Sequence, residues 1–208
     1  MESSYLICWD FDMTSFDRLK KNLKELPGIG EKSAERLIFF LISKGKKFSK
    51  ELSESILELS ENIKVCSICG SVDETDPCSI CSNNKRDENI LMVLEKPRDL
   101  FIFERTKRYN GLYHILGGLI SPLDGITPEK LSFEKLVNRI EDGKIKEVII
   151  ALSPSTEGET TTIYLTKLLK NKVEKITTIA RGIPFGTDFE YIDDFTLQCS
   201  VEKRQNID

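Results

Sequence analysis

The segment CSICGSVDETDPCSIC, residues 66–81, holds four cysteines in a C-x2-C-x8-C-x2-C array. Two such pairs, separated by a short loop, place four thiolates at the corners of a tetrahedron, the geometry of a closed structural zinc site. We therefore expect Cys66, Cys69, Cys78 and Cys81 to bind one structural Zn²⁺ per chain. The site would organise a small module at residues 65–88.

Disulfide bonds and redox chemistry are the alternative uses of these cysteines. The sequence shows no N-terminal signal peptide and no apolar run of about 18 residues, the length that suggests a membrane span. We therefore expect a cytoplasmic protein in a reducing compartment, which disfavours disulfides. A single CxxC pair is compatible with redox activity, but the second pair and the polar loop at residues 70–77 favour zinc.

Length and composition indicate an ordinary soluble protein with small modules. The chain has 208 residues, of which 39% are hydrophobic and 31% charged. Its net charge of −4 and pI near 5.3 argue against a uniformly basic nucleic-acid coat. The charge is uneven, however, because residues 16–50 contain ten Lys or Arg and four acidic side chains, a net +6. Most such runs are solvated helix surfaces, so the enclosed sequence decides their meaning.

The enclosed sequence is LPGIG, residues 26–30, which interrupts two helical patterns. Apolar residues recur at three- and four-residue spacing on both sides, at Phe16, Leu19, Leu23 and Leu26 and at Ala34, Leu37, Ile38 and Leu41. The pattern predicts a helix, a tight hairpin and a second helix. A simple αα-hairpin, whose Pro-Gly turn only closes the loop, fits this pattern as well.

A nucleic-acid interface is the functional interpretation of the same hairpin. Gly28 and Gly30 would let the backbone approach a ligand and expose N–H groups at the second helix's N-terminus, where the dipole favours an anion. Lys32 and Arg36 would add positive charge, so a phosphate of DNA is the expected occupant. Such contacts position DNA without reading its sequence. PGIG followed by Lys-Ser-Ala-x-Arg resembles the helix-hairpin-helix of DNA repair proteins, which favours this interpretation.

The remainder of the chain predicts an α/β unit with a mainly parallel sheet. Aliphatic runs predict strands at residues 90–94, 100–103, 147–152 and 175–180, with a polar turn at 153–159 and a helix from there to about residue 169. Ligands of such sheets bind at the carboxyl ends of strands. Glu95, Glu104 and the turn Glu157-Gly158-Glu159 are expected at those ends.

This arrangement of acids resembles the Toprim domain of topoisomerases, primases and related nucleases. Active members hold Mg²⁺ with an E…DxD pattern. Here Ser153 and Ser155 stand at both aspartate positions, and a neutral hydroxyl cannot replace the lost charge. The only histidine, His114, offers no other catalytic set, so no catalytic residues are expected.

The remaining acids, Glu95, Glu157 and Glu159, have two interpretations. They are either solvated loop charges that stabilise the start of the next helix or a docking face for a basic partner. We prefer the docking face on grounds of charge complementarity.

Taken in order, these features resemble the bacterial RecR family of recombination mediators. The matching segments are LPGIGEKSAERL (residues 26–37), the two CSIC pairs, YHILGGLISPLDGITP (113–128), STEGETT (155–161) and ARGIPFGTDFEYIDDFTL (180–197). They cover nearly the whole chain from about Phe16 onward. The opening Met1–Thr14 departs from the family's usual start, and its apolar stretch Tyr5–Phe11 is expected to pack on the fold or on a neighbouring subunit.

The resemblance implies a noncatalytic DNA repair protein of the bacterial cytoplasm and nucleoid. RecR-like proteins form ring-shaped homo-oligomers, here expected to be tetramers, that clamp single- and double-stranded DNA. With RecO, and sometimes RecF, they promote loading of RecA onto single strands. The rivals are a Mg²⁺-dependent Toprim nuclease, disfavoured by the two serines, and a zinc scaffold that binds only proteins.

The implied fold class is multidomain α+β. It comprises an N-terminal helical region with the helix-hairpin-helix (residues 1–64), the four-cysteine module (65–88), a C-terminal α/β Toprim domain (89–185) and a final segment that packs between subunits (186–208).

Overall fold

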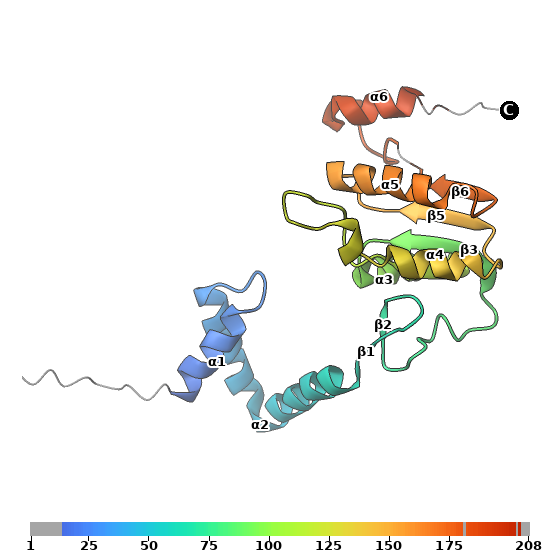
Figure 1. The fold of residues 1–208 in the computed structure, drawn as a ribbon. Helices are drawn as coiled ribbons and strands as arrows, with labels where there is room; N and C mark the ends of the chain where they lie inside the picture. The colour runs from blue at the N-terminus through green and yellow to red at the C-terminus, as the bar shows by residue number, and fades with distance from the viewer. Residues whose placement is uncertain (1–13, 181, 203, 205–208) are drawn as a thin grey trace, which may run out of the picture. The chain divides into compact units, whose positions relative to one another are not determined.

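The structure is a computed structural model that describes residues 14–180, 182–202 and 204. After Asn62 the chain divides into two compact units, residues 1–62 and 63–208 (Figure 1). The segment Tyr5–Phe11, for which packing was expected, lies outside the described residues. Along the described part of the chain, no helix combines the length and the apolar character needed to cross a bilayer.

The first unit is a helix-hairpin-helix, as expected. Helix α1 spans Ser15–Lys24 and helix α2 spans Glu31–Asn62. Helix α1 begins with a capping box, in which the Thr14 hydroxyl accepts from the Asp17 N–H at 3.2 Å and the Asp17 carboxylate accepts from the Thr14 N–H at 3.3 Å. Ala34 and Ile38 of α2 are buried, so the apolar face that the sequence predicted packs against α1.

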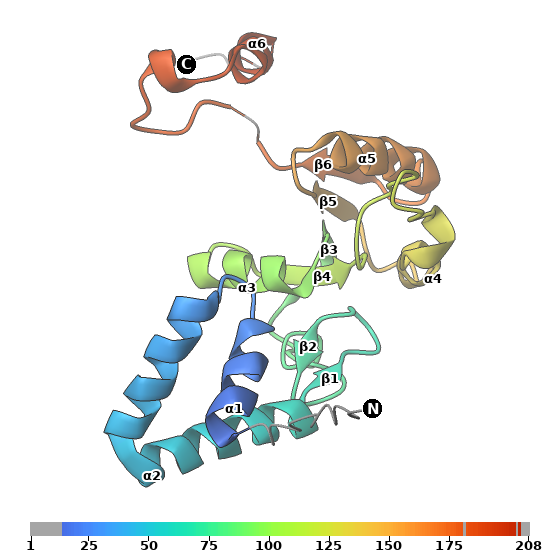
Figure 2. The same ribbon diagram turned by 90° about the vertical axis from the view of Figure 1, so that its left-hand side faces the viewer.

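Helix α2 is interrupted at Gly45, where φ is 80° and ψ is 177°. A side chain would make this left-handed backbone costly, so glycine permits the sharp change of direction that Figure 2 shows along α2. Leu52, Ile56 and Leu59, in the second half of α2, share one face and remain exposed. Nothing within the described part of this unit covers that face.

The second unit begins with a two-stranded antiparallel ribbon, β1 (Lys64–Val65) and β2 (Val72–Asp73), which carries the first cysteine pair. A four-stranded sheet follows, in the order β4-β3-β5-β6 with every neighbouring pair parallel. Its strands are β3 (Asp87–Leu94), β4 (Gly111–Ile115), β5 (Glu147–Ala151) and β6 (Lys175–Thr178). The predicted mainly parallel sheet is confirmed.

Helices alternate with these strands and cover both faces of the sheet (Figure 1). They are α3 (Pro97–Thr106), α4 (Phe133–Glu141) and α5 (Thr156–Leu169). Leu91 and Val93 of β3 face a core built with α4 and α5. Met92 and Leu94 point to the other face, where α3 packs. This alternation is the period of two that a strand buried on both faces requires.

The strand predicted at residues 100–103 is wrong, because these residues lie within α3. Pro97 supplies a fixed φ at the first helical position, where its missing N–H removes no hydrogen bond. Asp99 accepts from the Lys96 N–H at 3.0 Å and stabilises the same end. Leu100 is buried whereas Phe101 and Ile102 are exposed, so only one side of the run faces the sheet.

The second strand of the sheet in chain order is instead β4, which pairs with β3 and leads into the glycine- and proline-rich stretch 113–128. After β4 the chain forms a turn closed by a bridge between Ser121 and Ile126, then a 3-10 turn at Pro128–Lys130. A 3-10 turn at Phe189–Tyr191 and helix α6 (Asp194–Glu202) end the described chain.

Candidate functional site

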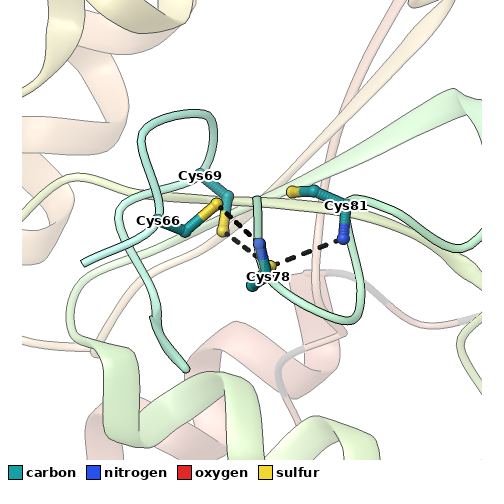
Figure 3. A group of neighbouring side chains, drawn as sticks. All are labelled: Cys66, Cys69, Cys78 and Cys81. Carbon is teal, nitrogen blue, oxygen red and sulfur yellow. Dashed lines mark hydrogen bonds between the residues drawn. The ribbon is translucent and has the colours of Figure 1, made fainter. Parts of the chain in front are cut away.

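The four predicted zinc ligands meet in the second unit. The Sγ atoms of Cys66, Cys69, Cys78 and Cys81 all lie within 4.8 Å of one another (Figure 3). Tetrahedral coordination with Zn–S bonds of about 2.3 Å needs sulfurs about 3.8 Å apart, and the Cys69–Cys78 pair is at 3.6 Å. All four thiols are free rather than joined in disulfides. The donor set therefore fits a single Zn²⁺ ion.

Backbone amides support the sulfurs. The N–H groups of Ser71, Cys78 and Cys81 donate to sulfurs of Cys69, Cys66 and Cys78, each at 3.4 Å. A hydrogen bond with Cys81 lowers the pKa of the Cys69 thiol, and the same contact raises the pKa of Cys81. A divalent cation would stabilise all four thiolates together.

The cysteine module is joined directly to strand β4 of the sheet. The Ile115 N–H donates to the Cys69 carbonyl at 2.7 Å. Gly70 adopts φ 76°, and a Cβ there would meet the Ile115 carbonyl oxygen at 3.3 Å, so glycine allows this close approach. Ile80 packs against both the cysteine cluster and the core beneath α3. The four-cysteine cluster is therefore part of the same packed unit as the sheet.

Glu104 has a structural role between the cysteine module and the sheet. It was expected at the end of a strand but lies in α3, where its carboxylate pairs with the Arg86 guanidinium. The Tyr113 hydroxyl donates to the same carboxylate at 2.6 Å, and Arg86 also donates to the Gly111 carbonyl at 3.2 Å. This network fixes residue 86, just beyond the second cysteine pair, to α3 and β4.

The hairpin of the first unit presents its backbone openly. Gly28 has φ 80°, and the Ile29 N–H closes the turn by donating to the Leu26 carbonyl at 3.1 Å. A Cβ built on Gly28 or Gly30 would meet no atom within 4 Å, so the loop is unobstructed. The first N–H groups of α2 have no intrahelical partner, because no preceding turn supplies carbonyls. An anion can approach them here.

The charges around the hairpin fall into two groups. Lys20 contacts Glu31 at 2.5 Å and Glu35 at 2.6 Å, and Lys24 contacts Glu31 at 2.5 Å. Hydrogen bonds from Lys20 and Lys24 lower the pKa of Glu31 to about 2, so this carboxylate stays ionised. Lys32 and Arg36 are exposed and have no ion-pair partner among the described residues. Lys32 and Arg36 are thus among the positive charges near the hairpin that no acid of the described residues pairs with, as are Arg18 and Lys21 on α1.

The acids predicted at the carboxyl ends of the strands also differ in burial and in charged partners. Glu95 follows β3 and is 7% exposed, with the Ser153 hydroxyl donating to it at 2.7 Å and the Lys96 ammonium at 2.7 Å. Burial opposes ionisation of Glu95, but Lys96 and Ser153 outweigh it and lower its pKa. Lys96, which the sequence interpretation missed, thus places a positive charge beside the one acid of the Toprim pattern that remains.

Glu157 and Glu159 lie in the first turn of α5 and are exposed, so the helix starts earlier than the predicted polar turn allowed. Ser155 caps this helix by accepting from the Gly158 N–H at 3.1 Å. A Cβ on Gly158 would clash with the Ser153 carbonyl oxygen, so only glycine fits. Within the described residues, the four cysteines are the one group of three or more metal-binding side chains, and these acids do not form another.

Four family models match successive parts of the chain. They are the RecR helix-hairpin-helix (residues 16–59), the RecR four-cysteine zinc finger domain (63–83), the Toprim domain (89–180) and the RecR C-terminal region (182–205).

Curated relatives match nearly the whole chain. Recombination protein RecR of Chloroherpeton thalassium is 47% identical over 189 residues, covering 88% of this chain and 92% of the relative. The proteins of the same name from Lactobacillus johnsonii and Bifidobacterium animalis are 43% and 42% identical over 191 and 193 residues, covering 91% and 93% of this chain and 96% of each relative. The chain belongs to the RecR family of recombination proteins.

Proposed function

We propose that this chain is a noncatalytic DNA-binding mediator of recombination and repair, which contacts DNA through the hairpin between α1 and α2. Two features carry the proposal: open backbone at Gly28 and Gly30, and charge at Lys32 and Arg36 that pairs with no acid among the described residues. Phosphate contacts of this kind tolerate any base sequence, which suits a mediator that acts wherever single strands arise. A ring-shaped homo-oligomer, such as a tetramer, would present several hairpins to one DNA molecule.

The double variant Lys32→Ala/Arg36→Ala tests this interface. Each lost phosphate contact should reduce the slope of log affinity against log salt by about 0.9 on duplex DNA and about 0.7 on single strands. We therefore expect a slope reduction of about 1.8 or 1.4 per DNA-contacting protomer, with weaker binding at every salt concentration. Fluorescence anisotropy at several salt concentrations measures both quantities.

Lys167→Ala/Lys170→Ala is the matched control, because both lysines are exposed on or just after α5 and the net charge changes equally. This variant should bind DNA as the wild type does. Equal losses in both variants would indicate only a general charge effect. Unchanged binding by the hairpin variant would instead favour a scaffold that binds proteins.

One Zn²⁺ per chain is proposed at the four cysteines, since four soft thiolates whose sulfurs all lie within 4.8 Å of one another suit zinc. The expected role is structural, because all four ligand positions are filled by protein and none is left for substrate. Elemental analysis of purified protein should find one equivalent of zinc per chain.

We also propose that the protein is not catalytic, because of the residues at the carboxyl ends of the strands. Ser153 and Ser155 replace the aspartates of active Toprim sites, and Lys96 lies beside the remaining Glu95 carboxylate. A positive side chain there competes with Mg²⁺ for the same oxygens. Nicked and single-stranded DNA should remain uncut in the presence of Mg²⁺, and metal-dependent cleavage would contradict this part of the proposal.

Partner docking is proposed at the acids of the same edge, with RecO as the basic partner and RecF as a possible further component. RecA loading in the bacterial cytoplasm would follow from that complex. Glu157 and Glu159 supply exposed negative charge at the start of α5. Glu95 follows β3, the strand next to the β5 strand that precedes α5. Charge complementarity at an interface favours encounter with an oppositely charged partner.

Charge reversal at Glu157→Lys/Glu159→Lys should weaken RecO binding at least tenfold, because attraction becomes repulsion. Isothermal titration calorimetry measures the affinity, and circular dichroism checks that α5 still forms. Glu134→Lys/Glu174→Lys makes the same charge change at exposed positions elsewhere on the unit and should leave RecO binding intact. RecO affinity that survives reversal at α5 would remove this docking face from the proposal.

A further inference from the structure

Two carboxylates lie between the cysteine pairs, Asp73 at the end of β2 and Asp76 in the loop that follows, and each contacts one pair. Asp76 Oδ1 accepts from both the N–H and the hydroxyl of Ser67, at 2.8 and 2.9 Å. Asp73 Oδ2 accepts from both the N–H and the hydroxyl of Ser79, at 2.8 and 2.7 Å. Ser67 and Ser79 occupy the same position in the two CSIC pairs, directly after the first cysteine.

The two contacts are crossed. Asp76 lies two residues before the second pair but binds the first, whereas Asp73 lies four residues after the first pair but binds the second. Each pair is therefore held both by amide hydrogen bonds to its sulfurs and by a carboxylate that lies beside the other pair. Because the serine N–H sits inside the turn that joins two ligand cysteines, the carboxylate fixes the direction in which that turn presents its sulfurs.

Electrostatics alone would disfavour these acids. Four thiolates around Zn²⁺ carry a net charge of −2, and nearby carboxylates repel such a centre. Their hydrogen bonds to the chain must therefore contribute more than that repulsion costs if these residues assist the site. Groups outside a metal's ligand set that orient its ligands typically change affinity by about 10- to 100-fold.

We propose that Asp73 and Asp76 are positioning residues of the metal centre, which bring the two cysteine pairs together before a metal binds. They touch no metal themselves and act through Ser67 and Ser79. The inference rests on the zinc centre proposed above, and it adds that this loop, rather than the ion alone, assembles the tetrahedron. It also gives a physical reason for two acids to lie beside a centre whose charge repels them.

Zinc affinity and metal-free thiol reactivity together test the proposal. We expect Asp73→Ala and Asp76→Ala each to weaken zinc binding by about 10- to 100-fold in competition with a chromophoric chelator. After removal of zinc, both variants should also react faster with a thiol reagent than metal-free wild type does, because their cysteines are less ordered. Asp→Asn variants keep an acceptor oxygen and should fall between wild type and alanine.

Glu74→Ala is the matched control. The Glu74 side chain is an exposed acid of the same segment and hydrogen-bonds neither Ser67 nor Ser79. This variant should bind zinc as tightly as wild type or slightly more tightly, because one repulsive charge is gone. Circular dichroism of the zinc-loaded variants confirms that the sheet is intact, and the asparagine variants serve if an alanine variant fails to fold.

The outcomes separate the two proposals. Wild-type protein without a tight zinc site would remove the metal centre itself. A tight site in wild type that the Asp73 and Asp76 variants retain, or that Glu74→Ala weakens equally, would overturn the positioning role and leave the metal centre in place. Asparagine variants that bind more tightly than wild type would show that repulsion outweighs positioning, which also overturns the role.

Discussion

At the residue scale, His114 shows how burial sets a protonation state. It lies in β4 and is 1% exposed, and its Nε2–H donates to the Ser132 carbonyl at 3.0 Å. Its Nδ1 is buried with no hydrogen-bond partner among the described residues. Burial lowers the pKa of His114 to about 4, and the Arg139 and Lys135 charges act in the same direction despite the Ser132 bond. The neutral ring is therefore the form that the fold accommodates.

A pH dependence of stability follows. The folded pKa of His114, about 4, lies below the ordinary value of 6.5, so protonation favours the unfolded chain. Its contribution is complete above pH 6.5 and is lost as the pH falls toward 4, by up to about 3 kcal/mol. Urea denaturation at several pH values measures the loss. His114→Gln keeps a donor for Ser132 but cannot titrate, so its stability should vary less over this range. An equally steep profile in that variant would assign the effect to other groups.

At the element scale, β4 depends on the cysteine module. It is an edge strand, so only β3 pairs with it in the sheet. At its last residue, the Ile115 N–H donates instead to the Cys69 carbonyl of the cysteine module. The local turn around Cys69 is in turn held by the hydrogen bond from Ser71 to its sulfur and by Gly70. Loss of the proposed Zn²⁺ should therefore loosen the sheet, although the four cysteines all lie outside it.

Zinc removal should thus loosen β4 more than the central strand. After chelation, we expect faster amide hydrogen exchange in peptides covering residues 111–116, because the Ile115 amide loses a rigid acceptor. Peptides covering β5, which is paired on both sides, should change little. Mass spectrometry of zinc-loaded and metal-free protein makes the comparison. Equal acceleration in both peptides would indicate global unfolding rather than a local effect on the edge.

At the scale of the whole molecule, exposed apolar side chains support self-assembly into the proposed ring. Ile56 and Leu59 on α2 are 59% and 62% exposed, and Leu52 lies on the same face. The C-terminal segment adds Phe189 and Phe195, each 70% exposed. Large exposed apolar sets on separate parts of one chain are typical of protein interfaces. Multiplying one hairpin around a ring would also strengthen DNA binding through avidity.

The double variant Ile56→Glu/Leu59→Glu should shift the oligomer to smaller species, because two charges cannot be buried in an apolar interface without a large cost. Sedimentation velocity measures the masses. Lys50→Glu changes the net charge by the same amount as this double variant, but on the opposite side of the same helix. It should leave assembly intact. A variant that assembles as wild type does would exclude this face of α2 from the interface.

Much of this organisation is determined by the sequence itself. The spacing of the cysteines, the glycines of the hairpin and the apolar runs of β3 and β5 are local patterns, and their meaning depends on residues only a few positions apart. The residues 100–103 were misassigned because a short apolar run suits either a strand or a buried helix face. The helix start at Pro97 and Asp99 was the local signal that distinguishes them.

Tertiary structure decided what depends on segments that meet only after folding. The sequence shows ten basic residues at positions 16–50, but only the packing of α1 on α2 determines that Lys20 and Lys24 pair with acids, whereas Lys32 and Arg36 do not. Likewise, the contacts of Glu95 with Ser153 and of Ile115 with Cys69 join residues far apart in the chain. Composition cannot encode such pairings directly, because the electrostatic and hydrogen-bonding partner of each group is chosen by the fold as a whole.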